Sequence, residues 1–281
     1  MLKTRILTAV VLIPAVLAAL FLLPVKAWAA VMLVVIALGG VEWCKLVGID
    51  CGMRKAFLSV LVLGGVTLFN APFAVFAGGW PTEYVVALCG IASLFWIFVA
   101  PPWVVRRWPT QGKLAMALVG LVVLLGAWMA IVQMQARSPW LVLAAMAIVW
   151  IADTAAYFSG RAFGKRKLAP LVSPGKSWEG VYGAWIAVAA YAAWLVRYAP
   201  DAGFRFDVTP LTIAAWIVFA VALASISVIG DLFESLLKRH AGVKDSGALL
   251  PGHGGVLDRT DALLAAMPIA AVAAEYCLRR P

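Results

Sequence analysis

Acidic residues are scarce in this chain, and their placement points to chemistry. Seven of the 13 Asp and Glu residues lie in two stretches, 153–179 and 231–261. In the second stretch, four polar side chains follow the i, i+3, i+4, i+7 spacing that puts them on one face of a helix: Asp231, Glu234, Ser235 and Lys238. Asp258 and Asp261, one helical turn apart, then open the next apolar segment. Because Mg²⁺ binds through one or two carboxylates together with substrate phosphates, this spacing predicts a site for a metal ion and phosphates.

The first stretch joins an intramembrane carboxylate to a basic, glycine-rich loop. Asp153 lies near the end of an apolar helix, and ionisable groups at membrane depth usually face a protein interior or a watery cavity. The loop's glycines let backbone approach a ligand, and its cations can neutralise phosphates: Arg161, Lys165, Arg166, Lys167 and Lys176. Residues 173–177 lead into a helix whose N-terminus could attract an anion, although their glycine spacing is not that of a P-loop. On charge alone an ordinary cytoplasmic loop is the simpler interpretation; the combination with Asp153 and the second stretch favours a phosphate site.

The composition places most of the chain in lipid. The 281 residues are 64% hydrophobic and 13% charged, whereas a soluble domain is about half apolar and about a quarter charged. The same numbers exclude intrinsic disorder. The net charge of +10 does not indicate nucleic-acid binding, because the basic residues stand in short clusters between long apolar runs. Four cysteines without a CxxC pair and only two histidines argue against a disulfide framework or a zinc site.

The apolar runs predict the fold class. A transmembrane helix needs about 20 mostly apolar residues. The segments that qualify are 6–24, 27–44, 56–78, 84–104, 114–134, 139–159, 180–199, 208–230 and 255–278. We therefore expect an all-α, polytopic integral membrane protein with about nine transmembrane helices. We further expect N-terminal membrane helices over 1–110 and a catalytic membrane region over 111–281, with an approximate boundary.

The distribution of basic residues predicts the orientation. With the N-terminus in the cytoplasm, the segments that face inward hold seventeen of the 23 Lys and Arg residues. Cytoplasmic loops carry this kind of excess. Both acidic stretches fall on the same side. We therefore expect a multi-pass protein of the cell's inner (cytoplasmic) membrane, with its active site facing the cytoplasm.

The residues from Ser235 to Asp261 resemble a known signature. Their sequence, SLLKRHAGVKDSGALLPGHGGVLDRTD, looks like that of the phosphatidate cytidylyltransferases, the CDP-diacylglycerol synthases. The residues that carry the resemblance are Ser235, Lys238, Arg239, Lys244, Asp245, Pro251, His253, Gly254, Gly255, Asp258, Arg259 and Asp261. The block 153–180, the chain length and the many-helix architecture also resemble this family.

The resemblance implies an activity and a set of site residues. Such enzymes transfer CMP from CTP to phosphatidate, giving CDP-diacylglycerol and pyrophosphate, and require Mg²⁺. The implied metal ligands are Asp231 and Asp258. The residues implied in catalysis are Asp231, Asp258, Lys238, Arg259 and Asp261. The residues implied in substrate binding are Asp153, Arg161, Lys165, Lys176, Ser177, Glu179, Ser235, Arg239, Lys244, Asp245, His253, Gly254 and Gly255.

Two other functions stay open on the sequence alone. A related CTP-dependent enzyme with another lipid acceptor is one, because the motif does not select the lipid. A cation-coupled transporter is the other, because buried carboxylates also line ion paths; against it, no inverted repeat is visible and the charges gather at one membrane face. The expected partners are CTP, phosphatidate and membrane lipids, without nucleic acid. A homodimer and a second, monovalent cation are left open.

Overall fold

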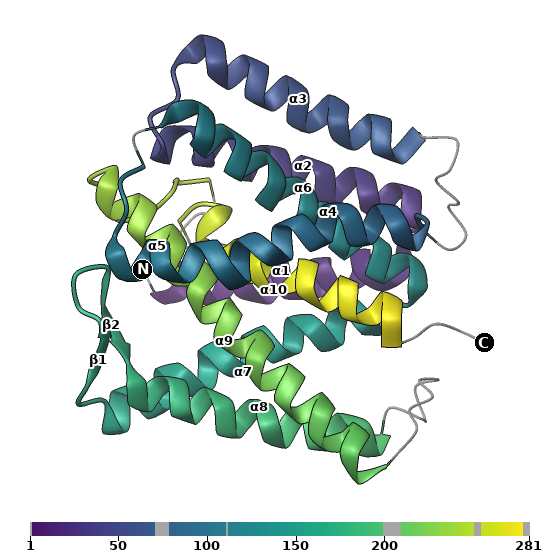
Figure 1. Ribbon diagram of the computed structural model, residues 1–281, viewed down its shortest axis with the longest axis vertical. Coiled ribbons are helices and arrows are strands. Elements are labelled where there is room, and N and C mark those ends of the chain that lie inside the picture. The colour runs from purple at the N-terminus through teal and green to yellow at the C-terminus, as the bar shows by residue number, and fades with distance from the viewer. Residues whose placement is uncertain (1, 71–78, 111, 199–208, 250–253, 278–281) are drawn as a thin grey trace.

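The computed structural model describes residues 2–70, 79–110, 112–198, 209–249 and 254–277 (Figure 1). Almost all of these residues are helical. The elements in chain order are α1 (Leu2–Leu22), α2 (Val25–Leu46), α3 (Cys51–Asn70), α4 (Thr82–Leu94), η1 (Phe95–Val99), α5 (Ala100–Arg106), α6 (Lys113–Arg137), α7 (Pro139–Phe163), β1 (Lys167–Ala169), β2 (Ser173–Ser177), α8 (Trp178–Tyr198), α9 (Pro210–His240) and α10 (Leu257–Cys277).

The helices confirm the all-α, polytopic membrane fold. Within the described ranges, eight helices are long and apolar enough to cross a membrane, from α2 to α10, with α4, η1 and α5 forming one continuous span. The remaining predicted segment, 6–24 at the start of the chain, coincides with α1. The apolar part of α1, Val10–Leu22, is shorter than the other spans. The last part of the predicted span 56–78 lies outside the described residues.

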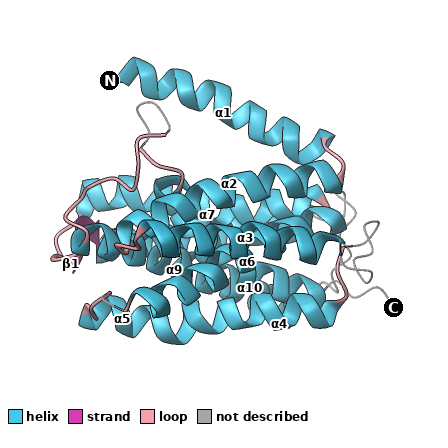
Figure 2. Ribbon diagram, turned by 90° about the horizontal axis from the view of Figure 1, so that it is seen from above, coloured by secondary structure: helices cyan, strands magenta, loops and turns pink. Residues whose placement is uncertain are grey.

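Two groups of helices make up the bundle. Figure 1 shows α2, α4, α6 and α10 running alongside one another, with α7 and α8 below them and α9 crossing obliquely from the lower group to the upper one. Helix α10 contacts both groups, because it packs against α4 and α6 on one side and against α9 on the other. Figure 2 shows α1 on the outer side of the bundle, beyond α2. The predicted division near residue 110 stays a prediction; helices from both sides of it pack together, α2 and α4 against α6.

Helix α9 is longer than its apolar stretch predicts, and the extra turns carry the polar motif. The predicted span ended at 230, but the helix continues to His240. It begins with a capping box between Thr209 and Thr212. It ends in a Schellman motif, in which Gly242 has φ +70° and the amide of Val243 donates to the carbonyl of Lys238. The acidic motif therefore sits on a continuous helix, as its spacing predicted.

An aromatic cluster fixes α9 against the first group of helices. Phe233 is almost completely buried, and its ring meets four others at centroid distances of 5.5 to 6.3 Å: those of Trp43, Phe95, Trp96 and Trp103. These rings come from α2, η1 and α5. Such large buried aromatic side chains dominate packing, so the neighbouring polar face of α9 is held at a fixed position relative to α2.

The basic loop after α7 is more ordered than the sequence predicted. Helix α7 continues to Phe163, and strands β1 and β2 then form an antiparallel hairpin. The carboxylate of Glu179 accepts hydrogen bonds from the amides of Lys165 and Arg166, both at 3.1 Å. At the other side of the hairpin, Nε of Arg239 donates to the carbonyl of Val172 at 3.2 Å. The hairpin is thereby fixed between α8 and the end of α9.

Candidate active site

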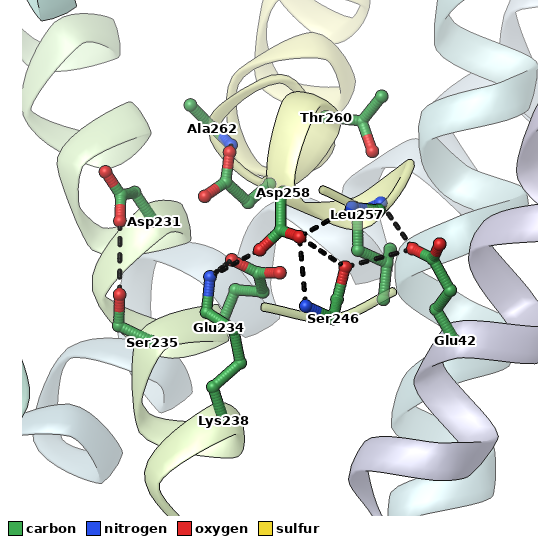
Figure 3. Close-up of polar contacts among 12 residues, drawn as sticks. Glu42, Asp231, Glu234, Ser235, Lys238, Ser246, Leu257, Asp258, Thr260 and Ala262 are labelled. Carbon is green, nitrogen blue, oxygen red and sulfur yellow. Dashed lines mark hydrogen bonds and ion pairs between the residues drawn. The ribbon is translucent and has the colours of Figure 1, made fainter. Parts of the chain in front are cut away.

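The centre of the polar motif is a lysine held between two carboxylates from different helices (Figure 3). Nζ of Lys238 donates to Oε2 of Glu234 at 2.6 Å and to Oδ1 of Asp258 at 2.7 Å. Glu234 and Lys238 lie one turn apart on α9, and Asp258 lies in the first turn of α10. All three side chains are largely shielded from solvent, with 7 to 11% of each exposed. In such surroundings a charge-assisted pair is strong and geometrically well defined.

Asp258 also organises the connection between α9 and α10. Its Oδ2 accepts three hydrogen bonds, from the amide and the hydroxyl of Ser246 at 2.9 and 3.0 Å and from the amide of Gly255 at 2.8 Å. The preceding Gly254 has φ +84°, a conformation that favours glycine. Together with the bond from Lys238, four donors fix both oxygens of this carboxylate.

Glu42 is a site residue that the sequence reasoning missed. It lies on α2, is 4% exposed, and accepts hydrogen bonds from the amides of Val256 and Leu257 at 3.0 and 2.8 Å. It also accepts one from the hydroxyl of Ser246 at 3.0 Å. Figure 3 shows it opposite Asp258, with Ser246 between the two. The signal was present in the sequence, because Glu42 is the first acidic residue of the chain and falls inside the predicted span 27–44.

Asp231 connects α9 to the basic hairpin. Its carboxylate forms an ion pair with Nζ of Lys176 at the end of β2 and accepts a hydrogen bond from Oγ of Ser235 at 3.3 Å. Asp153 of α7 lies close enough to both Lys176 and Asp231 to interact with their charges. The two acidic stretches singled out in the sequence therefore meet at one place, through Lys176.

Asp261 joins this cluster through a close approach of two helices. A Cβ on Gly230 would lie 2.6 Å from the carbonyl oxygen of Asp261, so only glycine lets α10 come this near to α9. The carboxylate of Asp261 interacts with the charges of Asp231 and Glu234. Oε1 of Glu234 is buried and has no hydrogen-bond partner within the described part of the chain. We call Asp231, Glu234, Asp258 and Asp261 the α9–α10 acidic cluster.

Several residues expected to bind substrate hold the hairpin and its flanking helices in place. Oγ of the buried Ser177 accepts a hydrogen bond from the amide of Gly180 at 3.2 Å, at the start of α8. Glu179 holds the amides of residues 165 and 166, and Arg239 holds the carbonyl of Val172. Hydrogen bonds from the Arg166 side chain to Glu179 and to the hydroxyl of Tyr182 raise the pKa of Arg166 above its usual value. These contacts fix the shape of the basic loop, and the substrate-binding roles expected of Ser177, Glu179 and Arg239 stay predictions.

The other expected residues lie at the surface or outside the described residues. Arg161 donates to the hydroxyl of Tyr157 at 3.2 Å on the exposed end of α7. Lys165 is exposed on the loop before the hairpin. Lys244 and Asp245 are exposed on the connection between α9 and α10, and Arg259 is exposed in the first turn of α10. His253 lies outside the described residues.

The fold and the site together make this chain a multi-pass membrane protein with a charged centre between two of its spans. A family model described as the cytidylyltransferase family matches residues 3–277. The chain is 40% identical over 277 residues to the phosphatidate cytidylyltransferase of Pseudomonas aeruginosa, covering 96% of this chain and 95% of that protein. It is 37% identical over 285 residues to the phosphatidate cytidylyltransferase of Haemophilus influenzae, covering 95% of this chain and 96% of that protein. The chain belongs to the cytidylyltransferase family, and it is a transferase of the membrane.

A third relative matches a shorter part of the chain. The phosphatidate cytidylyltransferase of Thermotoga maritima is 43% identical over 120 residues, which cover 43% of each chain. The family shown by the match over residues 3–277 agrees with the resemblance inferred from the 235–261 signature.

Proposed function

We propose that this enzyme transfers CMP from CTP to phosphatidate, giving CDP-diacylglycerol and pyrophosphate. The observation that carries the proposal is the similarity over almost the whole chain to two phosphatidate cytidylyltransferases. The site agrees with this chemistry, since it gathers carboxylates and lysines between spans that lipid surrounds. A lipid substrate and a nucleotide can both reach such a centre only if it lies near one membrane face.

The reaction needs alignment and charge neutralisation more than proton transfer. A phosphate oxygen of phosphatidate, already anionic, attacks the α-phosphorus of CTP. One P–O bond forms there, the bond between the α-phosphorus and the oxygen bridging to the β-phosphorus breaks, and pyrophosphate leaves with the electron pair. No general base is required, and the main obstacle is the repulsion between two polyanions. In our proposal Lys238, Lys176 and Arg259 supply positive charge, and the other basic residues of the segment 161–176 add more.

Mg²⁺ is the proposed cofactor, with Asp231 and Asp258 as its ligands. The donor set suits it, because this ion prefers carboxylate oxygens and Oε1 of Glu234, in the same cluster, is buried without a partner in the described residues. Across the described ranges no three His, Cys, Asp or Glu side chains form a ready metal site, so phosphate oxygens of the substrate would complete the ligand set. Bound there, the ion would neutralise charge on the phosphates and on the leaving pyrophosphate. Oδ1 of Asp258 already accepts a hydrogen bond from Lys238, so metal binding through that oxygen would require the ammonium group to share it or leave it.

The decisive experiment is an assay of the purified protein in lipid nanodiscs with labelled CTP, Mg²⁺ and one lipid acceptor at a time. We expect CDP-diacylglycerol and pyrophosphate in equal amounts with phosphatidate. Transfer only to a different lipid phosphate would replace the acceptor in the proposal. Ion flux in liposomes without any CMP transfer would instead favour the transporter.

The proposed location is the inner membrane, with the site facing the cytoplasm from which CTP arrives. Single cysteines, in a background without the four native ones, test this orientation with impermeant thiol reagents. Leu171, at the hairpin turn, and Ala248, between α9 and α10, are exposed and suit this purpose. A cysteine at Gly247 is unsuitable because its Cβ would overlap Glu42. Both sites should label only from the cytoplasm, and Gly203, which lies outside the described residues, only from the opposite side. A homodimer and a second, monovalent cation stay predictions.

A further inference from the structure

Helix α10 begins with a cap from another helix. The first amides of a helix have no partner within it, and they carry partial positive charge. At the start of α10 the amides of Val256 and Leu257 are bound by the carboxylate of Glu42 from α2. Asp258, the acidic residue in the first turn of α10, points instead toward Lys238 and the Ser246 segment. Glu42 of α2 thus caps the first amides of α10, and Asp258, in the first turn of α10, contacts Lys238 in the site instead.

The same carboxylate is linked to Asp258 through one hydroxyl. Oγ of Ser246 lies 3.0 Å from Oε2 of Glu42 and 3.0 Å from Oδ2 of Asp258. A hydroxyl has one hydrogen to donate, so Ser246 must share it between two carboxylates or serve one at a time. Any displacement of Glu42 therefore changes the hydrogen bonding of Asp258. The two carboxylates share one buried region, since Glu42 is 4% exposed and the side chain of Asp258 is 8% exposed.

Two glycines in the described parts of the connection between α9 and α10 make room for Glu42. A Cβ added at Gly247 would overlap Oε1 of Glu42, and one added at Gly255 would overlap Oγ of Ser246 and lie 2.5 Å from Oε2 of Glu42. Neither glycine has a positive φ, unlike Gly242 and Gly254 of the same connection. Close approach to Glu42, and at Gly255 to Ser246 as well, is therefore the reason for glycine at these positions. Both glycines lie against a buried anion that comes from the other half of the chain.

The geometry points to Glu42 as a positioning residue of the active site. It acts through Ser246 and the N-terminus of α10 to hold Asp258 opposite Lys238, and it contacts no substrate itself. This inference rests on the proposed function for its kinetic consequences. Residues that orient a catalytic or metal-binding carboxylate from behind typically change activity by about 10- to 100-fold when they are replaced.

The test compares Glu42→Gln with Glu275→Gln in nanodiscs. Glu275 is the matched control, because it is also 4% exposed and also accepts several hydrogen bonds, but lies at the other end of α10. We expect Glu42→Gln to lower kcat by about 10- to 100-fold, with KM for CTP and for phosphatidate nearly unchanged. Glu42→Asp, which keeps the charge, should recover part of the loss, and Glu275→Gln should retain the wild-type kcat.

A second measurement does not depend on the reaction. Hydrogen–deuterium exchange of the peptide that contains Val256 and Leu257 should accelerate in Glu42→Gln and stay unchanged in Glu275→Gln. If Glu42→Gln does not fold, Ser246→Ala replaces it and should lower kcat without exposing those two amides. Wild-type kcat and exchange in Glu42→Gln, or equal losses of kcat in the Glu42 and Glu275 variants, would overturn the inference. Should the wild-type protein make no CDP-diacylglycerol, the proposed function fails, and the exchange alone decides whether Glu42 holds this segment.

Discussion

The two ends of α10 bury charge in different ways. At its C-terminal end, Glu275 accepts hydrogen bonds from Thr82 at 2.7 Å, from Gln133 at 2.6 Å and from Arg137 at 2.9 and 3.2 Å. One carboxylate meets one guanidinium there, and neutral donors occupy the rest. At its N-terminal end, the four carboxylates of the α9–α10 acidic cluster face the two ammonium groups of Lys176 and Lys238.

This difference distinguishes the C-terminal end of α10, which is a structural contact, from the N-terminal end, which is the proposed active site. A buried ion pair with every donor and acceptor used costs about as much to desolvate as it returns, so it mainly fixes geometry. An excess of carboxylates in a largely buried cluster, including an oxygen without a partner in the described residues, is stable only if protons or a further cation neutralise it. We therefore expect substitutions at the N-terminal end to change turnover and those at the C-terminal end to change stability.

The largest effect should come from Asp258→Asn. The amide keeps the shape of the side chain but removes its charge and places a donor where Lys238, Ser246 or Gly255 now donates. We expect kcat to fall by about 1,000-fold or more, because the residue would lose both its proposed ligand role and its hold on Lys238. Asp231→Asn should follow the same direction. Steady-state kinetics across a Mg²⁺ titration provide the measurement, with the elution profile of each variant as the folding control.

Near-normal turnover of a folded Asp258→Asn protein at ordinary Mg²⁺ would remove this carboxylate from the metal site. The same result for Asp231 alone would leave Asp258 in place. Only the result for Asp258 would remove the functional half of the contrast between the two ends of α10.

The next largest effect should come from Lys238→Gln. Its ammonium group is 11% exposed and neutralises Glu234 and Asp258 together. Losing a charge-assisted contact in the transition state costs about 2–4 kcal/mol, or roughly 30- to 1,000-fold in rate. Arg259→Gln tests the exposed cation that follows Asp258 in the sequence, and the Michaelis constant that rises would indicate which substrate each one holds. Equal and mild effects of both variants would mean that these cations do not act on phosphates.

The sequence predicted most of the fold and much of the site, for physical reasons. Hydrophobic runs locate spans because lipid requires them, and the i, i+3, i+4 spacing placed the polar face of α9 correctly. A local Schellman motif sets the end of α9 at His240. Two other features depended on contacts between distant segments. The hairpin is fixed by hydrogen bonds that Glu179 accepts, and Glu42 is fixed by the hydrogen bonds it accepts from residues 246, 256 and 257. No local pattern reveals such pairings, although a carboxylate inside an apolar span, such as Glu42, is itself a signal of a buried site.

A smaller effect, on stability alone, is expected for Glu275→Gln. The amide would leave the guanidinium of Arg137 without its anion and would face the Gln133 side chain with a poorer hydrogen-bonding match. The loss should be about 1–2 kcal/mol, near the lower end for such contacts, because Arg137 is 45% exposed and water screens part of the pair. Thermal denaturation in detergent should show the loss, while kcat stays within about twofold of wild type. A large fall in kcat at unchanged stability would contradict the assignment of this end as structural.

The smallest effect should come from Lys113→Gln, which tests whether any exposed cation matters or only those in the site. Nζ of Lys113 lies 3.6 Å from Asp50, and both side chains are more than half exposed. A hydrogen bond from the amide of Met53, with a lesser contribution from Lys113, lowers the pKa of Asp50. A lowered carboxylate pKa adds stability that is fully present at neutral pH and is lost only as pH falls through that pKa, so the contribution of the pair does not change between roughly pH 6 and 8. Because both side chains are more than half exposed, that contribution is small. Turnover, both Michaelis constants and thermal stability should therefore nearly match the wild type across that range. A loss comparable to that of Lys238→Gln would show that the positive charge acts through the exposed surface as a whole, and that the site at the start of α10 is not special among the basic segments.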